Sequence, residues 1–207
     1  MLKRVLNRQR FQPGRYFFQP VHKDEKRIYN RDMKKPVRAS GEPTYVEHPF
    51  PPVYDKDAKV LILGSLPSVK SREQRFYYGH PQNRFWKVLA AILEVPVPQT
   101  IEQKKDMLLA GHIAIWDVIQ SCTIIGSSDA SIKDAVPVDL TALLREAPIQ
   151  AIFCNGQTAF RYYKKFLEPL TGIQAKVLPS SSPANAAWKL PALTEAWKQA
   201  ILPFLKP

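Results

Sequence analysis

Cysteine and histidine are scarce in this chain of 207 residues, and their spacing excludes the common metal centres. The two cysteines, Cys122 and Cys154, form no CxxC pair, and the four histidines are scattered. No zinc-binding pattern therefore occurs. An iron–sulfur cluster takes about four ligands, so two cysteines cannot hold one. We expect no metal, no cofactor, and two reduced core cysteines of a cytoplasmic protein.

Long apolar runs are also missing. No run of about eighteen consecutive apolar residues occurs, so we expect no membrane span and no membrane partner. The chain starts with MLKRVLNRQRF, which has basic residues but lacks the apolar stretch of a secretory signal. We therefore expect no such signal.

Several catalytic motifs are absent as well. The sequence contains no GxxxxGK[ST] phosphate loop, no GxGxxG fingerprint and no GxSxG elbow. Ser65 follows an apolar run, but no histidine and aspartate are spaced to make it a serine hydrolase nucleophile. Near the predicted strand ends, Asp117 and Asp129 are almost the only carboxylates, so a catalytic site with paired carboxylates is hard to build. These absences argue against the common nucleotide-binding and hydrolase classes.

Positive charge is what the chain has in excess. The net charge is +12 and the isoelectric point is near 9.7, which indicates a polyanionic partner such as nucleic acid. Residues 1–50 hold twelve Lys and Arg against five Asp and Glu, a net charge of +7. We expect residues 1–47 to be a basic, poorly ordered arm and residues 48–207 to be one domain. Three interpretations of the arm stay open. It tethers the protein to phosphates, it is an extension without a role, or translation begins at Met33 and only a short segment precedes the domain.

The domain alternates between apolar runs and segments of helical periodicity. This alternation predicts an α/β fold, with right-handed crossovers and a mostly parallel sheet between helices. Residues 117–137 are expected to be loop-like. The predicted strands are 59–64, 112–116, 149–154 and 175–178, and the predicted helices are 83–94, 101–110, 139–147, 157–169 and 190–204.

The carboxyl ends of parallel strands meet at one edge of the sheet, where ligands bind. Three groups of side chains gather there: the aromatic run 76–78, the serines of 180–182, and Asn83. Each has a plain structural explanation, as core, turn and helix cap respectively. Together, on a basic protein, they indicate a pocket for a base taken out of nucleic acid.

Three motifs carry a family resemblance: GSLPS (64–68), YYGHPQNRFW (77–86) and SSSPAN (180–185). They resemble the active-site motifs of the uracil-DNA glycosylase superfamily, and the hypoxanthine (deoxyinosine) DNA glycosylases are the most similar branch. The resemblance covers about 48–204. It implies a three-layer α/β/α fold with a four-stranded parallel sheet, in agreement with the pattern above.

The resemblance also implies roles for single residues. The mismatch-specific uracil glycosylases have, in the first motif, an Asn that positions the attacking water, and Leu66 stands there in this chain. The hypoxanthine branch shares this loss and is thought to use the Asn of HPxN, here Asn83. Tyr78 matches the aromatic residue that stacks on the flipped base. Asp117 falls where relatives place a base-reading side chain, or it is structural.

The remaining predicted site residues surround these. Ser65 is a catalytic candidate through its backbone N–H, while Gly64 and Asn155 are placed with the base-binding residues. The second motif is expected to press into the minor groove and to hold phosphates. Its predicted DNA-binding residues, with two nearby cations, are Ser180, Ser181, Ser182, Pro183, Asn185, Lys70 and Arg84.

The predicted function is therefore hydrolysis of the N-glycosidic bond of a deaminated base, foremost hypoxanthine, in double-stranded DNA. We expect a monomer that works in the cytoplasm at the nucleoid. Uracil and xanthine stay open as substrates, and a mismatch-specific uracil-DNA glycosylase is the alternative enzyme. The alternative from another class is a non-catalytic binder of damaged or single-stranded DNA.

Overall fold

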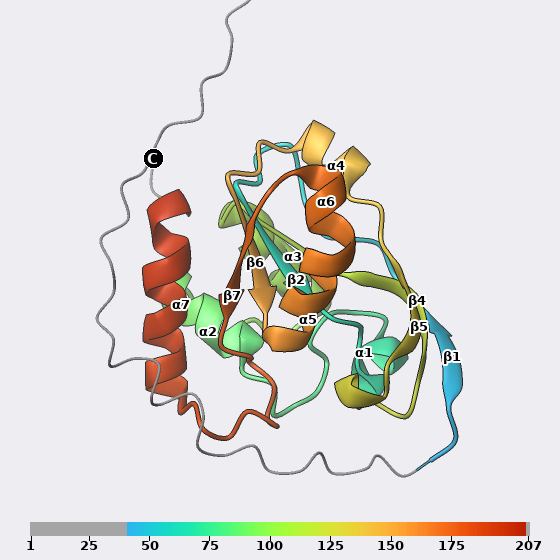
Figure 1. The fold of residues 1–207 in the computed structure, drawn as a ribbon. Coiled ribbons are helices and arrows are strands. Elements are labelled where there is room, and N and C mark those ends of the chain that lie inside the picture. The colour runs from blue at the N-terminus through green and yellow to red at the C-terminus, as the bar shows by residue number, and fades with distance from the viewer. Residues whose placement is uncertain (1–40, 206–207) are drawn as a thin grey trace, which may run out of the picture. The chain divides into compact units, whose positions relative to one another are not determined.

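A four-stranded parallel sheet lies at the centre of the computed structural model, which describes residues 41–205 (Figure 1). Its spatial order is β3-β2-β6-β7, and every neighbouring pair is parallel. These strands confirm the four that the sequence predicted. Their bounds are β2 (Val60–Gly64), β3 (Ile113–Asp117), β6 (Ala151–Asn155) and β7 (Ala175–Leu178).

Strand β2 is buried along its whole length, because helices cover both faces of the sheet. Successive side chains of a strand point to opposite faces. Val60 and Ile62 therefore join one core, and Leu61 and Leu63 join the other. The result is the predicted three-layer arrangement.

The helices divide between these two cores, as Figure 1 shows. The first core contains side chains of α2 (Phe85–Leu93), α3 (Ile101–Ala110) and α7 (Leu190–Leu205). The second contains side chains of α4 (Thr141–Glu146), α5 (Gln157–Tyr162) and the π-helical turn at Tyr163–Leu167. This turn continues into the short helix α6 (Glu168–Thr171).

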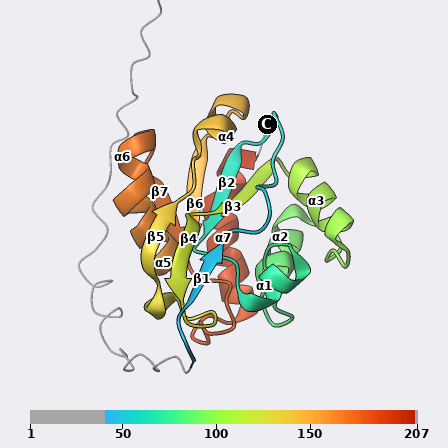
Figure 2. The same cartoon turned by 90° about the vertical axis from the view of Figure 1, so that its right-hand side faces the viewer.

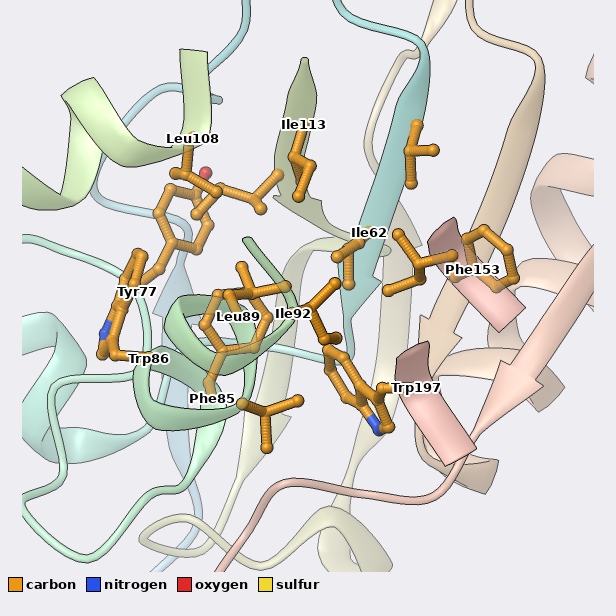
Figure 3. Packing of buried hydrophobic residues seen from close by; sticks show 14 of the residues in the cluster. Ile62, Tyr77, Phe85, Trp86, Leu89, Ile92, Leu108, Ile113, Phe153 and Trp197 are labelled. Atoms are coloured by element: carbon orange, nitrogen blue, oxygen red, sulfur yellow. The ribbon is translucent and has the colours of Figure 1, made fainter. Parts of the chain in front are cut away.

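Trp197 of α7 connects the first core to the loop that follows β7. Its side chain is fully buried and lies near Ile92 and Phe85 of α2 (Figure 3). The indole Nε1 donates a hydrogen bond of 2.9 Å to the carbonyl of Pro179. Packing of the core thus holds the start of the serine-rich loop in place.

A second sheet, which the sequence did not predict, packs beside the first (Figure 2). Its antiparallel strands have the order β1-β4-β5. Residues 117–137, expected to be loop-like, contain β4 and β5, so that prediction was wrong. Irregular register at Ile119, Ser121 and Thr123 breaks the alternation that marks a strand. The bounds are β1 (Thr44–Glu47), β4 (Ile119–Ile124) and β5 (Lys133–Pro137).

Strand β1 falls inside the segment 1–47 that was expected to be a poorly ordered arm. Residues 44–47 instead pair with β4, far along the chain. Only Val46 of β1 is buried, so its sequence shows little apolar pattern. The rest of the predicted arm, including Met33, lies outside the described residues.

A short helix, α1 (Val69–Gln74), occupies part of the segment expected to be a loop. Ser68 begins it by accepting a hydrogen bond from the backbone N–H of Ser71 at 3.2 Å. Arg75 ends it in the left-handed conformation. The helix turns the chain back towards the sheet.

Cys122 and Cys154 are both free and buried, as expected. Burial raises the pKa of the Cys154 thiol to about 12, so it stays neutral. Among the helices of residues 41–205, none is long and apolar enough to span a membrane.

Candidate active site

A pocket of about 580 Å³ opens where the strands of the central sheet end. Its volume falls in the range of small-ligand sites. Segments from both sheets, from the loop before α2 and from the loop after β7 line it. Its lining residues include Gly64, Ser65, Leu66, Lys70, Tyr78, His80, Asn83, Asp117, Asp129, Asn155, Ser180, Ser181, Ser182, Pro183 and Ala184.

The buried part of the pocket holds Asp117, at the end of β3, beside Gly64, at the end of β2. A Cβ atom on residue 64 would lie 2.1 Å from Oδ1 of Asp117, so only glycine allows this approach. The other carboxylate oxygen, Oδ2, lies 2.9 Å from Nε2 of His48. A carboxylate oxygen can only accept a hydrogen bond, so Nε2 of His48 is the donor in this contact.

Tyr78 supplies a flat aromatic wall. Its backbone is left-handed, with φ of 51°, which is unusual for a bulky residue. The ring stacks on Phe85, with centroids 3.7 Å apart and planes inclined by 16°. Burial, and secondarily the negative charge of Asp117, raises the pKa of Tyr78, so its hydroxyl stays protonated. That hydroxyl is buried without a hydrogen-bond partner in the described part of the chain.

Asn83 contacts the serine-rich loop directly. Its Oδ1 accepts a hydrogen bond from the backbone N–H of Phe85 at 3.0 Å and from the Ser181 hydroxyl at 2.9 Å. Asn155, at the end of β6, accepts from the Ser181 backbone N–H and donates to Ser181 Oγ, both at 2.9 Å. The structure therefore joins three predicted site residues from separate segments of the chain.

Ser65 faces a carboxylate rather than an imidazole. Its Oγ donates to Oδ1 of Asp129 at 3.0 Å. Asp129 is exposed as a residue. Partial desolvation raises the pKa of its carboxylate, while the hydrogen bond from Ser65 lowers it. No histidine contacts Ser65 in residues 41–205, so the serine hydrolase interpretation gains no support.

Arg84 does not extend towards solvent as a phosphate-binding cation would. The sequence predicts a DNA-binding role for Arg84, but its guanidinium donates to backbone carbonyls of the loop after β7. It bonds Ser182 at 2.7 Å and Asn185 at 3.0 Å, with longer bonds near 3.3–3.4 Å to Ser180 and Ser181 and a further bond to Trp188. Arg84 thus shapes the loop that carries Ser181.

Of the other predicted DNA-binding residues, Asn185 is hydrogen-bonded within the loop after β7, while Pro183 and Lys70 are exposed. Asn185 donates from Nδ2 to the Ser180 carbonyl at 2.9 Å, so its amide stabilises the loop. Pro183 is exposed at the mouth of the pocket, where DNA can reach it. Lys70 is also exposed there and forms a surface ion pair of 2.7 Å with Glu73. Such a pair contributes little to stability.

Arg84→Lys should change the stability of the protein, whereas Lys70→Met should change its affinity for DNA. We expect Arg84→Lys to lower the free energy of unfolding by about 1–3 kcal/mol, because an ammonium cannot replace the planar set of donors. Lys70→Met should leave that free energy within about 0.5 kcal/mol but reduce the salt slope of DNA affinity by about 0.9. Urea unfolding and binding titrations at several salt concentrations measure both. A normal stability of Arg84→Lys would contradict the bracing role.

One site residue, His48, had no signal in the sequence, and a predicted one, Ser181, has a role that the sequence did not indicate. His48 contacts Asp117, which lies 69 positions further along the chain. The role of Ser181 as a link between Asn83 and Asn155 was also missed. A run of three serines does not reveal which hydroxyl is buried, and Ser181 alone of the three is fully buried.

The arrangement suits a flat, polar ligand. Tyr78 offers a ring for stacking, Asp117 offers an acceptor, and Asn83 offers an amide donor, all within one pocket. Among residues 41–205, no group of three or more histidine, cysteine, aspartate or glutamate side chains is arranged to hold a metal ion. The side chains of the pocket supply hydrogen bonding and stacking.

Comparison with known proteins identifies the family. The model of the uracil DNA glycosylase superfamily matches residues 51–206. A protein of Methanosarcina acetivorans named hypoxanthine DNA glycosylase is 39% identical over 145 residues, which are 68% of this chain and 89% of the relative. One of the same name from Methanosarcina barkeri is 34% identical over 156 residues, 73% of this chain and 95% of the relative.

A solved structure agrees with this assignment. The solution NMR structure of a candidate uracil DNA glycosylase from Methanosarcina acetivorans superposes with a TM-score of 0.64. Its sequence is 35% identical, and the match covers 75% of this chain and 96% of that one. The sheet, the pocket and these matches together place the chain in the uracil DNA glycosylase superfamily.

Proposed function

We propose that this protein is a DNA repair enzyme that hydrolyses the N-glycosidic bond of hypoxanthine (deoxyinosine) in double-stranded DNA. The observation that carries the proposal is the composition of the pocket. Leu66 lines it where the mismatch-specific uracil glycosylases have a water-positioning Asn, while Asn83 lines it as an alternative amide. The two relatives named hypoxanthine DNA glycosylase support the same substrate.

The damaged nucleotide must first leave the duplex. Flipping costs a few kcal/mol, and least at a mismatched or damaged pair. Stacking of the base on Tyr78 would return about 1–3 kcal/mol. Because Phe85 already covers one face of the Tyr78 ring, that ring is a rigid platform for the base. We expect the protein to act as a monomer, because the pocket of one chain is enough to hold one flipped base.

Recognition of hypoxanthine would use Asp117. Hypoxanthine carries a hydrogen on N1, which a carboxylate oxygen can accept, whereas N1 of adenine is itself an acceptor. The hydrogen bond from His48 holds the carboxylate of Asp117 in place at the strand end. This contact would favour the deaminated base over the intact purine.

Cleavage breaks the bond between C1′ of the sugar and N9 of the base. The electron pair goes to the base, and a cationic, oxocarbenium-like sugar develops. A water oxygen then bonds to C1′, and the proton that water gives up balances the one the base takes. Donors aimed at the base stabilise its negative charge in the transition state. The amide of Asn83 and the backbone N–H groups of Gly64 and Ser65 are the proposed donors.

A substrate panel tests this function. Duplexes that carry inosine, uracil, xanthine or an intact base opposite each partner are incubated with the protein, and abasic sites are cleaved with alkali. We expect base release from inosine duplexes foremost, and none from adenine. Preference for mismatched uracil would instead indicate the uracil enzyme, and tight binding without any release would indicate a non-catalytic binder.

A further inference from the structure

The hydrogen bonds around Ser181 have a direction that the positions of backbone N–H groups determine. We call the three side chains Asn155, Ser181 and Asn83 the amide–serine chain. At one end, the backbone N–H of Ser181 donates to Asn155 Oδ1. At the other end, the backbone N–H of Phe85 donates to Asn83 Oδ1. A backbone N–H can only donate, so both amides have one possible orientation.

The Ser181 hydroxyl completes the chain in one direction only. Because Asn155 Oδ1 is an acceptor, the atom of Asn155 that faces Ser181 Oγ is Nδ2, which donates. The hydroxyl therefore accepts from Asn155 and gives its own hydrogen to Asn83 Oδ1. Ser181 is fully buried, so water does not compete for these bonds.

The consequence falls on Asn83. An amide oxygen has two lone pairs, and the N–H of Phe85 and the hydroxyl of Ser181 use both. This oxygen is therefore not free to accept a hydrogen bond from the attacking water. The amide nitrogen Nδ2 of Asn83 donates to no atom of residues 41–205, and Asn83 lines the pocket.

We propose that Asn83 acts as a hydrogen-bond donor to the departing base, and that Ser181 and Asn155 are positioning residues that fix its amide in that orientation. This inference rests on the proposed function. It separates two roles, orienting water and donating to the base, that an asparagine can play in this reaction. Negative charge grows on the purine as the bond to C1′ breaks, and a preorganised donor stabilises it.

The first test replaces the amide by a carboxylate. In Asn83→Asp, the carboxylate oxygen at the place of Oδ1 still accepts from Phe85 and Ser181, so the local fold is retained. The second oxygen replaces Nδ2, so the N–H donor is lost. We expect the single-turnover rate of inosine excision to fall about 10²–10³-fold at pH 8. The rate should partly recover as the pH falls and the new carboxyl group becomes protonated. A wild-type rate for Asn83→Asp would overturn the proposal, because it would show that an oxygen acceptor suffices.

The second test reverses the direction of the chain. In Asn155→Asp, the carboxylate still accepts from the Ser181 backbone but cannot donate to its hydroxyl, which then turns away from Asn83. We expect a fall in rate of about 10-fold, as in Ser181→Ala, with little change in the dissociation constant for an uncleavable inosine analogue. Acid pH should restore the excision rate of Asn155→Asp, because the protonated carboxyl group can donate to the Ser181 hydroxyl. It should not restore the rate of Ser181→Ala, which has no hydroxyl. The double variant should be no slower than Ser181→Ala.

Ser121→Ala is the matched control, because it removes a buried hydroxyl outside the pocket lining. Its excision rate should equal that of the wild type. Losses that multiply in the double variant, or an unchanged rate in Ser181→Ala, would overturn the positioning role. If the wild-type protein releases no base, the proposed function fails by itself.

A readout independent of activity completes the design. In the free protein, the Ser181 hydroxyl proton should be visible by NMR, protected from exchange and close to Asn83. It should lose its contact with Asn83 in Asn155→Asp. Observation of the same contact in both proteins would overturn the assigned direction, whatever the enzyme does to DNA.

Discussion

Asn83→Ala should abolish most excision of hypoxanthine while leaving DNA binding nearly intact. The substitution removes the side-chain donor that we place against the departing base, so the loss should be on the order of 10²–10³-fold in the single-turnover rate. Binding depends mainly on phosphate contacts and stacking, neither of which uses Asn83. A labelled inosine duplex, alkaline cleavage and a binding titration measure both quantities.

The control must separate catalysis from the hydrogen bond that Asn83 makes at the start of α2. Asn83 Oδ1 accepts the backbone N–H of Phe85, the first residue of that helix, and losing a side-chain bond at a helix start costs about 0.5–2 kcal/mol. Asn83→Ser keeps an oxygen that can accept this N–H but has no amide. It should therefore unfold close to the wild-type denaturant concentration and still be inactive. Undiminished cleavage by Asn83→Ala would remove Asn83 from the mechanism.

Gly64→Ala should disable the pocket even though it adds a single methyl group. The new Cβ would lie 2.1 Å from Oδ1 of Asp117 and 3.2 Å from the Tyr78 hydroxyl, so the carboxylate must move. Moving it breaks the contact with His48 and misplaces the proposed acceptor for the base. We expect a loss of about 10²-fold in excision and about 1–3 kcal/mol in the free energy of unfolding. Single-turnover kinetics and urea unfolding measure these.

Gly172→Ala is the control, because it should lower the stability of the protein without changing the pocket. Gly172 ends α6, has φ of +67°, and would place a Cβ in open space. Its left-handed backbone makes the substitution cost about 1–2 kcal/mol, with no effect on the pocket. We expect normal excision from Gly172→Ala at temperatures where it is folded. Equal activity of Gly64→Ala and wild type would show that the place of Asp117 does not matter.

The central sheet could be predicted because each of its strands is a short apolar run bounded by turn residues. Val60 to Leu63 are buried on both faces, so the run is continuous and easy to recognise. The helices between strands then require parallel pairing and one common edge for the strand ends. From this alone, Gly64, Asp117, Asn155 and Ser180 were expected near each other, and all four line the pocket.

The small sheet could not be predicted in the same way. Strands β1 and β5 are mostly exposed, and the pairing of β4 with β5 is irregular in register. Strand β1 pairs with β4 about 75 positions further along the chain, as with Val46 and Cys122. Propensity and periodicity are local properties, whereas this pairing depends on tertiary contacts. His48 follows β1, so its place beside Asp117 was equally hidden.

The sequence by itself determined the family, the α/β order and many of the residues that line the pocket. Those properties follow from motifs and from local periodicity. Only the tertiary structure decided what each side chain does there: Arg84 braces a loop, Ser181 links two amides, and the oxygen of Asn83 is already occupied. The physical reason is that a hydrogen bond depends on distance and direction, and residues far apart in sequence acquire both only when the chain folds.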